Sequence, residues 1–144
     1  MSEEKKPPKQ VIIVRADLKM QRGKEIAQGS HASMSFIAKR LEAERYEAAG
    51  YVGPPIPGHY KLFLKPIEEE WLYNGRFTKI GLAAESREQL LALHEKALAA
   101  GLESHLITDS GLTVFHGIPT DTCIAIGPDE PEKIDAITQG LKLR

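Results

Sequence analysis

The run Val11–Val14 (VIIV) constrains the fold more than any other feature of the sequence, because successive β-branched apolar residues are typical of a strand buried on both faces. Such a strand needs helices on both sides of its sheet. Further segments with strand character follow at residues 77–84, 104–108 and 122–126. Helical patterns are found at about residues 24–41, 65–74, 87–100 and 131–138.

The order of these segments, β-α-(α)-β-α-β-β-α, predicts a single α/β domain with a four-stranded mixed sheet and helices on both faces. A chain of 144 residues has the usual size of one domain. The third and fourth strands are too close in sequence to be joined by a helix, so they should be antiparallel. Gly127-Pro128 is expected to end the fourth strand.

Two of the helices have a predictable buried side. The buried stripe of the first should consist of residues spaced by three and four, namely Ala27, Ser30, Met34, Ile37, Ala38 and Leu41. In the helix after Ser86, a capping box with Gln89 is expected at the start, and Gly101 should end it. Its predicted core residues are Leu90, Leu93, Ala97 and Leu98.

The segments outside these elements are less regular. Residues 1–10 are charged and contain proline, which predicts a disordered lead-in to a domain over residues 11–144. Residues 51–60 (YVGPPIPGHY) should form a loop. No apolar run approaches the ~20 residues of a membrane span, and the N-terminus does not resemble a signal peptide. A single cysteine fits a reducing compartment, with the cytosol as the expected location.

Charge is distributed unevenly along the chain. The net charge is -1, but residues 1–40 hold nine Lys or Arg against four Asp or Glu. Four of these cations, Arg15, Lys19, Arg22 and Lys24, surround the loop after the first strand. They could bind phosphates of a nucleic acid, or they could simply form a solvated basic surface.

The helix after this loop offers the first group of candidate functional residues. Lys24, Gln28 and His31 lie within roughly 60° of one another on a helix, at spacings i, i+4 and i+7. The free N–H groups of the first turn also favour an anion. A phosphate or a developing oxyanion would fit there, although each residue could instead be solvated or held in the core.

A second group follows the third strand. Asp109, at a strand end beside Ser110-Gly111, could orient a water molecule or accept a proton, or could be an ordinary turn residue. Thr113 and Thr120 add hydroxyl groups nearby. If the two strand ends are adjacent, Lys24, His31 and Asp109 can converge in one cleft.

Several kinds of site are disfavoured. The remaining histidines lack ligand-like spacing, so no metal is expected. Cys123 should be an unreactive core residue. The sequence has no G-x-S-x-G and no glycine-rich phosphate-binding motif, which disfavours a serine hydrolase triad and nucleotide cofactors.

Residues 11–32 (VIIVRADLKMQRGKEIAQGSHA) resemble the N-terminal signature of the type 2 peptidyl-tRNA hydrolases. The matching positions are Arg15, Asp17, Leu18, Met20, Gly23, Lys24, Ala27, Gln28, His31 and Ala32. A second block, residues 107–113 (ITDSGLT), resembles that family's Ile-x-Asp-Ala-Gly-x-Thr, and AIGP at 125–128 and a closing helix at 135–143 match as well.

The resemblance implies hydrolysis of the ester between a peptide and tRNA by a homodimer, without a metal or organic cofactor. In that reading Asp109, acting through His31, orients the water, and Lys24 with Thr113 stabilises the tetrahedral oxygen or the leaving group. Arg15, Lys19 and Arg22 hold the acceptor phosphates. Gln28 and Thr120 complete the substrate site.

The sequence also departs from the family pattern. Gly29 replaces a common cysteine, Ser110 an alanine and Leu112 a common arginine. Residues 115–122 (FHGIPTDT) form a different loop, and residues 42–65 resemble an insertion. Two other functions stay open: a non-catalytic module that binds RNA or a protein, and a hydrolase of a small-molecule ester or amide.

Overall fold

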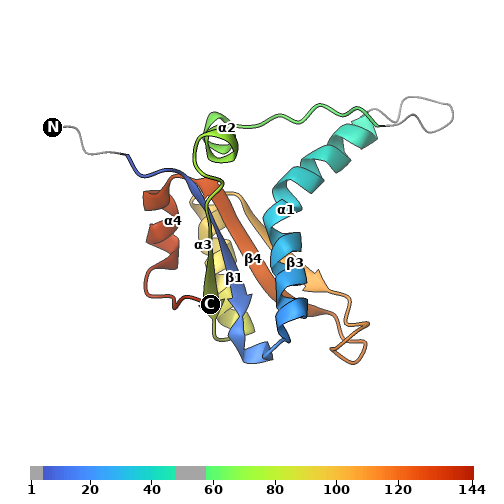
Figure 1. The fold of residues 1–144 in the computed structure, drawn as a ribbon. Helices are drawn as coiled ribbons and strands as arrows, with labels where there is room; N and C mark the ends of the chain where they lie inside the picture. The colour runs from blue at the N-terminus through green and yellow to red at the C-terminus, as the bar shows by residue number, and fades with distance from the viewer. Residues whose placement is uncertain (1–4, 48–57) are drawn as a thin grey trace.

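The computed structural model describes residues 5–47 and 58–144 (Figure 1). Its strands are β1 (Lys9–Arg15), β2 (Lys79–Ala84), β3 (Ser104–Asp109) and β4 (Thr120–Asp129). Its helices are the short 3-10 helix η1 (Ala16–Leu18), α1 (Arg22–Glu47), α2 (Pro66–Tyr73), α3 (Arg87–Ala99) and α4 (Pro131–Thr138). This order of strands and α-helices confirms the predicted α/β arrangement. Among the residues that the structure describes, no helix is both long enough and apolar enough to cross a membrane.

The four strands form one mixed sheet in the order β2-β1-β4-β3. β1 and β2 are parallel, whereas β4 runs antiparallel to both β1 and β3, which confirms the predicted antiparallel pair. Because β1 and β3 both run opposite to β4, their carboxyl ends lie at the same edge of the sheet. The two loops that carry the candidate functional residues leave from that edge.

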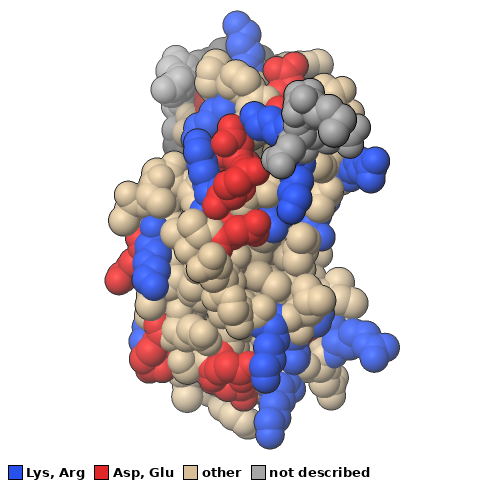
Figure 2. Space-filling model, turned by 90° about the vertical axis from the view of Figure 1, so that its left-hand side faces the viewer, with Lys and Arg blue, Asp and Glu red and all other residues tan. Residues whose placement is uncertain are grey.

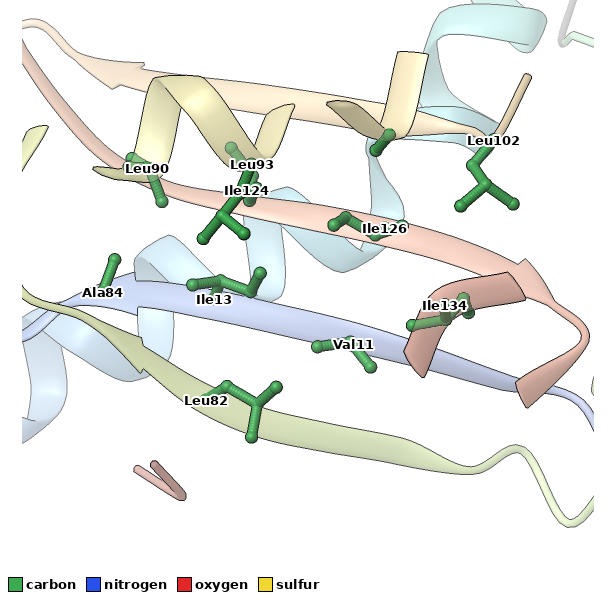
Figure 3. Close-up of a cluster of buried hydrophobic side chains, with 11 residues drawn as sticks. Val11, Ile13, Leu82, Ala84, Leu90, Leu93, Leu102, Ile124, Ile126 and Ile134 are labelled. Carbon is green, nitrogen blue, oxygen red and sulfur yellow. The ribbon is translucent and has the colours of Figure 1, made fainter. Parts of the chain in front are cut away.

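Helices cover both faces of the sheet, as predicted (Figure 1). On one face, α3 and α4 pack on apolar side chains of β1, β2 and β4, among them Ile13, Leu82 and Ile124 (Figure 3). On the other face, α1 packs its Ala32 against Val14, Cys123 and Ala125. α2 lies beside α1, with the ring of Trp71 packed edge to face on Phe36 at 6.2 Å between centroids.

An ion cluster joins α1, α2 and the start of β3. The guanidinium of Arg40 donates to both carboxylate oxygens of Glu68 at 2.6 and 2.8 Å, and to Glu103 at 2.9 Å. It also donates to the carbonyl of Phe63 at 3.1 Å. Glu68 is 1% exposed and receives one further hydrogen bond, from the backbone N–H of Lys65. Arg40 therefore neutralises a carboxylate that is removed from water.

The predicted buried stripe of α1 is wrong. Ala27, Ser30, Met34 and Ala38 are exposed, and Ile37 and Leu41 are only half-buried. The buried side instead consists of Gln28, Gly29, Ala32, Ser35 and Phe36. α1 lies close to the sheet here: a methyl group at Gly29 would be in van der Waals contact with Ile12, at 3.6 Å.

Some predicted boundaries also change. β1 begins at Lys9, so the last two residues of the predicted lead-in belong to the sheet, and Gln10 is fully buried. Residues 1–4 and 48–57, and with them most of the predicted loop at 51–60, lie outside the described residues. β4 continues through Gly127-Pro128 to Asp129, because a register shift opposite β1 accommodates this dipeptide within the strand.

The two C-terminal helices follow the predictions in part. Ser86 caps α3 by accepting a hydrogen bond from the N–H of Gln89, but the Gln89 side chain binds the N–H of Glu85 and does not complete the box. Leu98 is 51% exposed, whereas the other three predicted core residues of α3 are buried. α4 ends at Thr138, so the chain from Gln139 onward is not part of the closing helix.

Candidate active site

Lys24, in the first turn of α1, lies at the centre of a polar cluster at the carboxyl edge of the sheet. Its Nζ donates to Asp109 Oδ1 at 2.8 Å and to Thr113 Oγ1 at 2.9 Å. Asp109 is the last residue of β3, and Thr113 lies in the loop that follows it. The two segments singled out in the sequence therefore meet. β4 separates β1 from β3, and α1 spans it on one face of the sheet.

The carboxylate of Asp109 is held by three donors. Lys24 and the Gln28 amide, at 3.3 Å, share Oδ1, and the backbone N–H of Gly111 donates to Oδ2 at 2.9 Å. The hydrogen bond from Lys24 is the main reason why the pKa of Asp109 lies below its ordinary value. Burial opposes this effect, and the hydrogen bond from the Gly111 N–H lowers the pKa further. Asp109 is therefore ionised at neutral pH.

Gln28 is buried and holds a fixed orientation. Its Oε1 accepts a hydrogen bond from Thr122 Oγ1 at 2.5 Å, so its NH₂ group faces Asp109. The neighbouring Cys123 donates through its thiol to the carbonyl of Gln28 at 3.2 Å. Burial raises the pKa of Cys123 to about 11, which keeps the thiol protonated and confirms that this cysteine belongs to the core.

Gly111 fixes the path of the loop after β3. Its φ of +83° lies in the left-handed region, and a Cβ at this position would overlap the backbone of Ile118. The carbonyl of Gly111 accepts a hydrogen bond from Gly117 N–H at 2.9 Å, which closes the loop. Only glycine allows this close crossing, so Gly111 sets the position of both Asp109 and Thr113.

A cleft of about 670 Å³ lies beside the cluster. One wall is the loop after β1, with Leu18, Lys19 and Met20, and the other is the loop between β3 and β4, with Phe115 and Ile118. The ring centroid of Phe115 lies 5.7 Å from Lys24 Nζ, so this side chain connects the cleft to the cluster. Lys24, Asp109 and Thr113 do not themselves line the cleft, and Phe115 lies between it and the Lys24 ammonium.

Some of the cations around the cleft are paired with protein groups, and others are exposed to solvent. Arg15 is bound by Asp17, at 2.7 and 3.1 Å, and by the carbonyl of Asp121 at 3.0 Å, so it braces two loops. Arg87 is likewise paired with the Asp121 carboxylate at 2.9 Å. Lys19 and Arg22 are exposed. Figure 2 shows Lys and Arg side chains gathered at the lower end of the molecule, where Figure 1 places the loop after β1.

The predicted site residues separate into three sets. Lys24, Gln28, Asp109 and Thr113 come together in the cluster. Arg15, Lys19 and Thr120 line the cleft. The Thr120 hydroxyl donates to the carbonyl of Ile118. Arg22 is the first residue of α1. The exposed imidazole of His31 forms no hydrogen bond with any described residue. A relay from His31 to Asp109 thus has no contact to support it within the described chain.

Three residues of the site were not singled out in the sequence. Thr122 gives no local signal, because its role depends on pairing with Gln28, which is 94 residues away. Phe115 and Ile118 belong to residues 110–120, which contain no Lys, Arg, Asp or Glu. This composition could have been used to predict an apolar surface there. Within residues 5–47 and 58–144, His, Cys, Asp and Glu side chains form no group of three that could hold a metal ion.

Comparison with known proteins identifies the family of the chain. The model of the family "Peptidyl-tRNA hydrolase PTH2" matches residues 8–144. The chain belongs to this family. A peptidyl-tRNA hydrolase of Methanopyrus kandleri is 40% identical over 94% of this chain and 97% of its own length. That of Methanothermobacter thermautotrophicus is 37% identical over 94% and 98%.

A solved structure of a protein of unknown function from Agrobacterium tumefaciens shares the fold. It superposes with a TM-score of 0.53 at 16% identity and covers 94% of this chain and 96% of that chain. Within the PTH2 match, residues 11–32 and 107–113, which carry the resemblance, are the segments that supply the polar cluster.

Proposed function

We propose that this chain hydrolyses the ester that links a peptide to the 3′ end of tRNA, with Lys24, Asp109 and Thr113 acting on the ester. The observation that carries the proposal is the Lys24 ammonium, which binds Asp109 and Thr113 beside a cleft lined by Phe115, in a member of the PTH2 family. Ester hydrolysis needs an oriented water and a donor for the developing oxyanion, and this cluster offers both.

Lys24 and Thr113 stabilise the tetrahedral oxygen. An ammonium has three N–H donors, and two of those of Lys24 are used by Asp109 and Thr113, which leaves one for the substrate. Thr113 accepts from Lys24, so its own O–H is available as a second donor. Both donors are fixed before the substrate binds, which is the condition for effective stabilisation of the oxyanion.

Asp109 orients the attacking water. A carboxylate accepts about four hydrogen bonds, and those from Lys24, Gln28 and Gly111 leave a place for one more donor. Because its pKa is lowered, Asp109 is a weak base and takes the water proton only as the new C–O bond forms. The bond to the ribose oxygen then breaks, and that oxygen receives the proton held by Asp109. The peptide leaves as a carboxylic acid, which loses the second proton of the water to solvent. Gln28 acts as a positioning residue.

The exposed cations beside the cleft bind the RNA. Lys19 and Arg22 have free surface, whereas Arg15 binds Asp17 and the Asp121 carbonyl and supports the loop that carries Lys19. Two phosphate contacts predict that kcat/KM for N-acetylaminoacyl-tRNA falls about tenfold between about 50 and 200 mM salt. Replacing both Lys19 and Arg22 with glutamine should weaken this salt dependence.

The deciding experiment is release of the N-acetylamino acid from N-acetylaminoacyl-tRNA by the purified protein, followed over that range of salt. A non-catalytic RNA-binding module would bind the tRNA and leave the ester intact. A hydrolase of small esters would cleave an N-acetylamino acid methyl ester as efficiently, with little effect of salt. Either result would contradict the proposal.

The homodimer and the cytosolic location are part of the same proposal. Ile26 and Met34 are 63% and 62% exposed on α1, and with Ala27, Ser30 and Ala38 they form an apolar side that a second copy can cover. The single cysteine and the proposed substrate fit the cytosol, where peptidyl-tRNA is made.

Met34→Glu should convert the dimer to a monomer, because it places a charge on each copy at the centre of this surface. Sedimentation equilibrium of the two proteins at the same concentration measures the effect. Leu98→Glu, at an exposed apolar position on α3, is the matched control and should leave the mass unchanged. A monomeric unaltered protein, or a Met34→Glu dimer of unchanged affinity, would exclude this interface.

A further inference from the structure

The loop between β3 and β4 has an unusual surface for a loop beside an RNA-binding site. Residues 110–120 (SGLTVFHGIPT) contain no Lys, Arg, Asp or Glu. Leu112, Val114 and Ile118 are 85%, 50% and 64% exposed. We call residues 110–120 the apolar loop. Without Lys or Arg, this loop offers no cation to a phosphate. Its exposed apolar side chains are typical of a surface that binds a ligand.

The apolar loop and the loop after β1 line opposite walls of the cleft. Val114, Phe115 and Ile118 line one wall, and Leu18 and Met20 line the facing wall, beside Lys19. Phe115 also approaches Lys24 Nζ, at 5.7 Å from its ring centroid, and Thr113 is adjacent to Val114 in the chain. A group bound against this wall is therefore next to the atoms that hold the ester.

A peptidyl-tRNA has two chemically different halves that meet at the ester. The RNA half is a polyanion and is attracted to the cations of residues 15–24, whereas the peptide half begins with the side chain of the esterified amino acid. The uncharged apolar wall matches an apolar side chain and offers no cation to RNA. Asp121, which also lines the cleft, is paired with Arg87 and accepts a hydrogen bond from Thr108, so its charge is neutralised within the protein.

From this arrangement we propose that Val114, Phe115 and Ile118 form a subsite for the side chain of the amino acid esterified to tRNA, and that the subsite favours large apolar side chains. The inference rests on the proposed hydrolase function and adds a selectivity to it. Each buried methylene of the substrate contributes a modest preference, so a phenylalanyl or leucyl ester should exceed a glycyl ester by roughly tenfold or more in kcat/KM.

One tRNA sequence, charged in turn with N-acetylated phenylalanine, leucine, glycine and aspartate, isolates the contribution of the side chain. The expected order of kcat/KM is phenylalanine and leucine above glycine, with aspartate lowest. The double variant Val114→Thr/Ile118→Thr keeps the β-branched shape and adds two hydroxyl groups. It should lower kcat/KM for phenylalanine several-fold and leave that for glycine nearly unchanged.

Leu98→Thr makes the same kind of change at an exposed position on α3 and should leave the whole series unaltered. Equal kcat/KM for all four amino acids in the unaltered protein would overturn the subsite while the hydrolase function stands. An equal loss for glycine and phenylalanine in the double variant would also overturn it, because the loop would then bind a part common to all substrates, such as the terminal adenosine. Absence of hydrolysis with every ester would instead contradict the proposed function.

Discussion

Replacing Asp109 with asparagine should lower kcat for N-acetylaminoacyl-tRNA by about a hundredfold or more. The amide cannot accept the hydrogen bond from Lys24 and the Gly111 N–H in the same way, and it removes the negative charge that holds the ammonium in place. Lys24→Met should cause a loss of similar size, because the variant has no charged donor for the tetrahedral oxygen. Release of the N-acetylamino acid under single-turnover conditions measures both effects.

The double variant of these two residues should be little worse than either single variant, because the two groups act as one unit. Asp135→Asn is the matched control: it removes an exposed carboxylate on α4 whose ion pair with Lys9 contributes little, and kcat should not change. His31→Ala separates a direct role of Asp109 from a relay through His31. Normal turnover by folded Asp109→Asn and Lys24→Met proteins would remove the cluster from the mechanism.

Arg40→Met should lower the free energy of unfolding by about 3 kcal/mol or more, because it leaves the buried carboxylate of Glu68 without its cation. For a domain of this size such a change lowers Tm by about 10 °C. Thermal unfolding followed by circular dichroism provides the measurement. The loss should not depend on the cluster of Lys24, Asp109 and Thr113, which lies at the other end of the sheet, near the end of β3 rather than its start.

Two further variants test the physical cause. Arg40→Met/Glu68→Gln should be more stable than Arg40→Met alone, because the second change removes the unpaired charge. Lys39→Met, at the exposed neighbouring position, should stay within about 0.5 kcal/mol of the unaltered protein. A Tm of Arg40→Met equal to that of Lys39→Met would show that Glu68 is protonated or hydrated without Arg40.

The sheet was predictable because its signals are local. The β-branched run at residues 11–14 and the close spacing of the last two strands determine burial and direction with little help from the rest of the chain. The buried side of α1 was not predictable from apolar spacing. Its contacts with the sheet use a glycine, an alanine and the amide of Gln28, so hydrophobicity does not mark the inner side.

The site was predictable to the extent that its residues lie in the two matching segments. Lys24 and Asp109 could be named, but the sequence could not show that they bind each other, since 85 residues separate them. Arg15 shows the opposite case. Its charge suggested a phosphate contact, yet Asp17, two residues away, binds the guanidinium. Charge patterns locate a basic region, whereas side-chain pairing decides which cations can reach a ligand.

The strand order β2-β1-β4-β3 has a consequence for the time at which the protein becomes active during its own synthesis. β3, which ends in Asp109, pairs with β4 and with no other described strand, so a nascent chain that stops before residue 120 has no sheet partner for it. The ammonium and the carboxylate are brought together only after the penultimate element emerges and inserts beside β1. Until β4 has emerged, the nascent chain therefore lacks the contact between Lys24 and Asp109 on which the proposed hydrolysis depends.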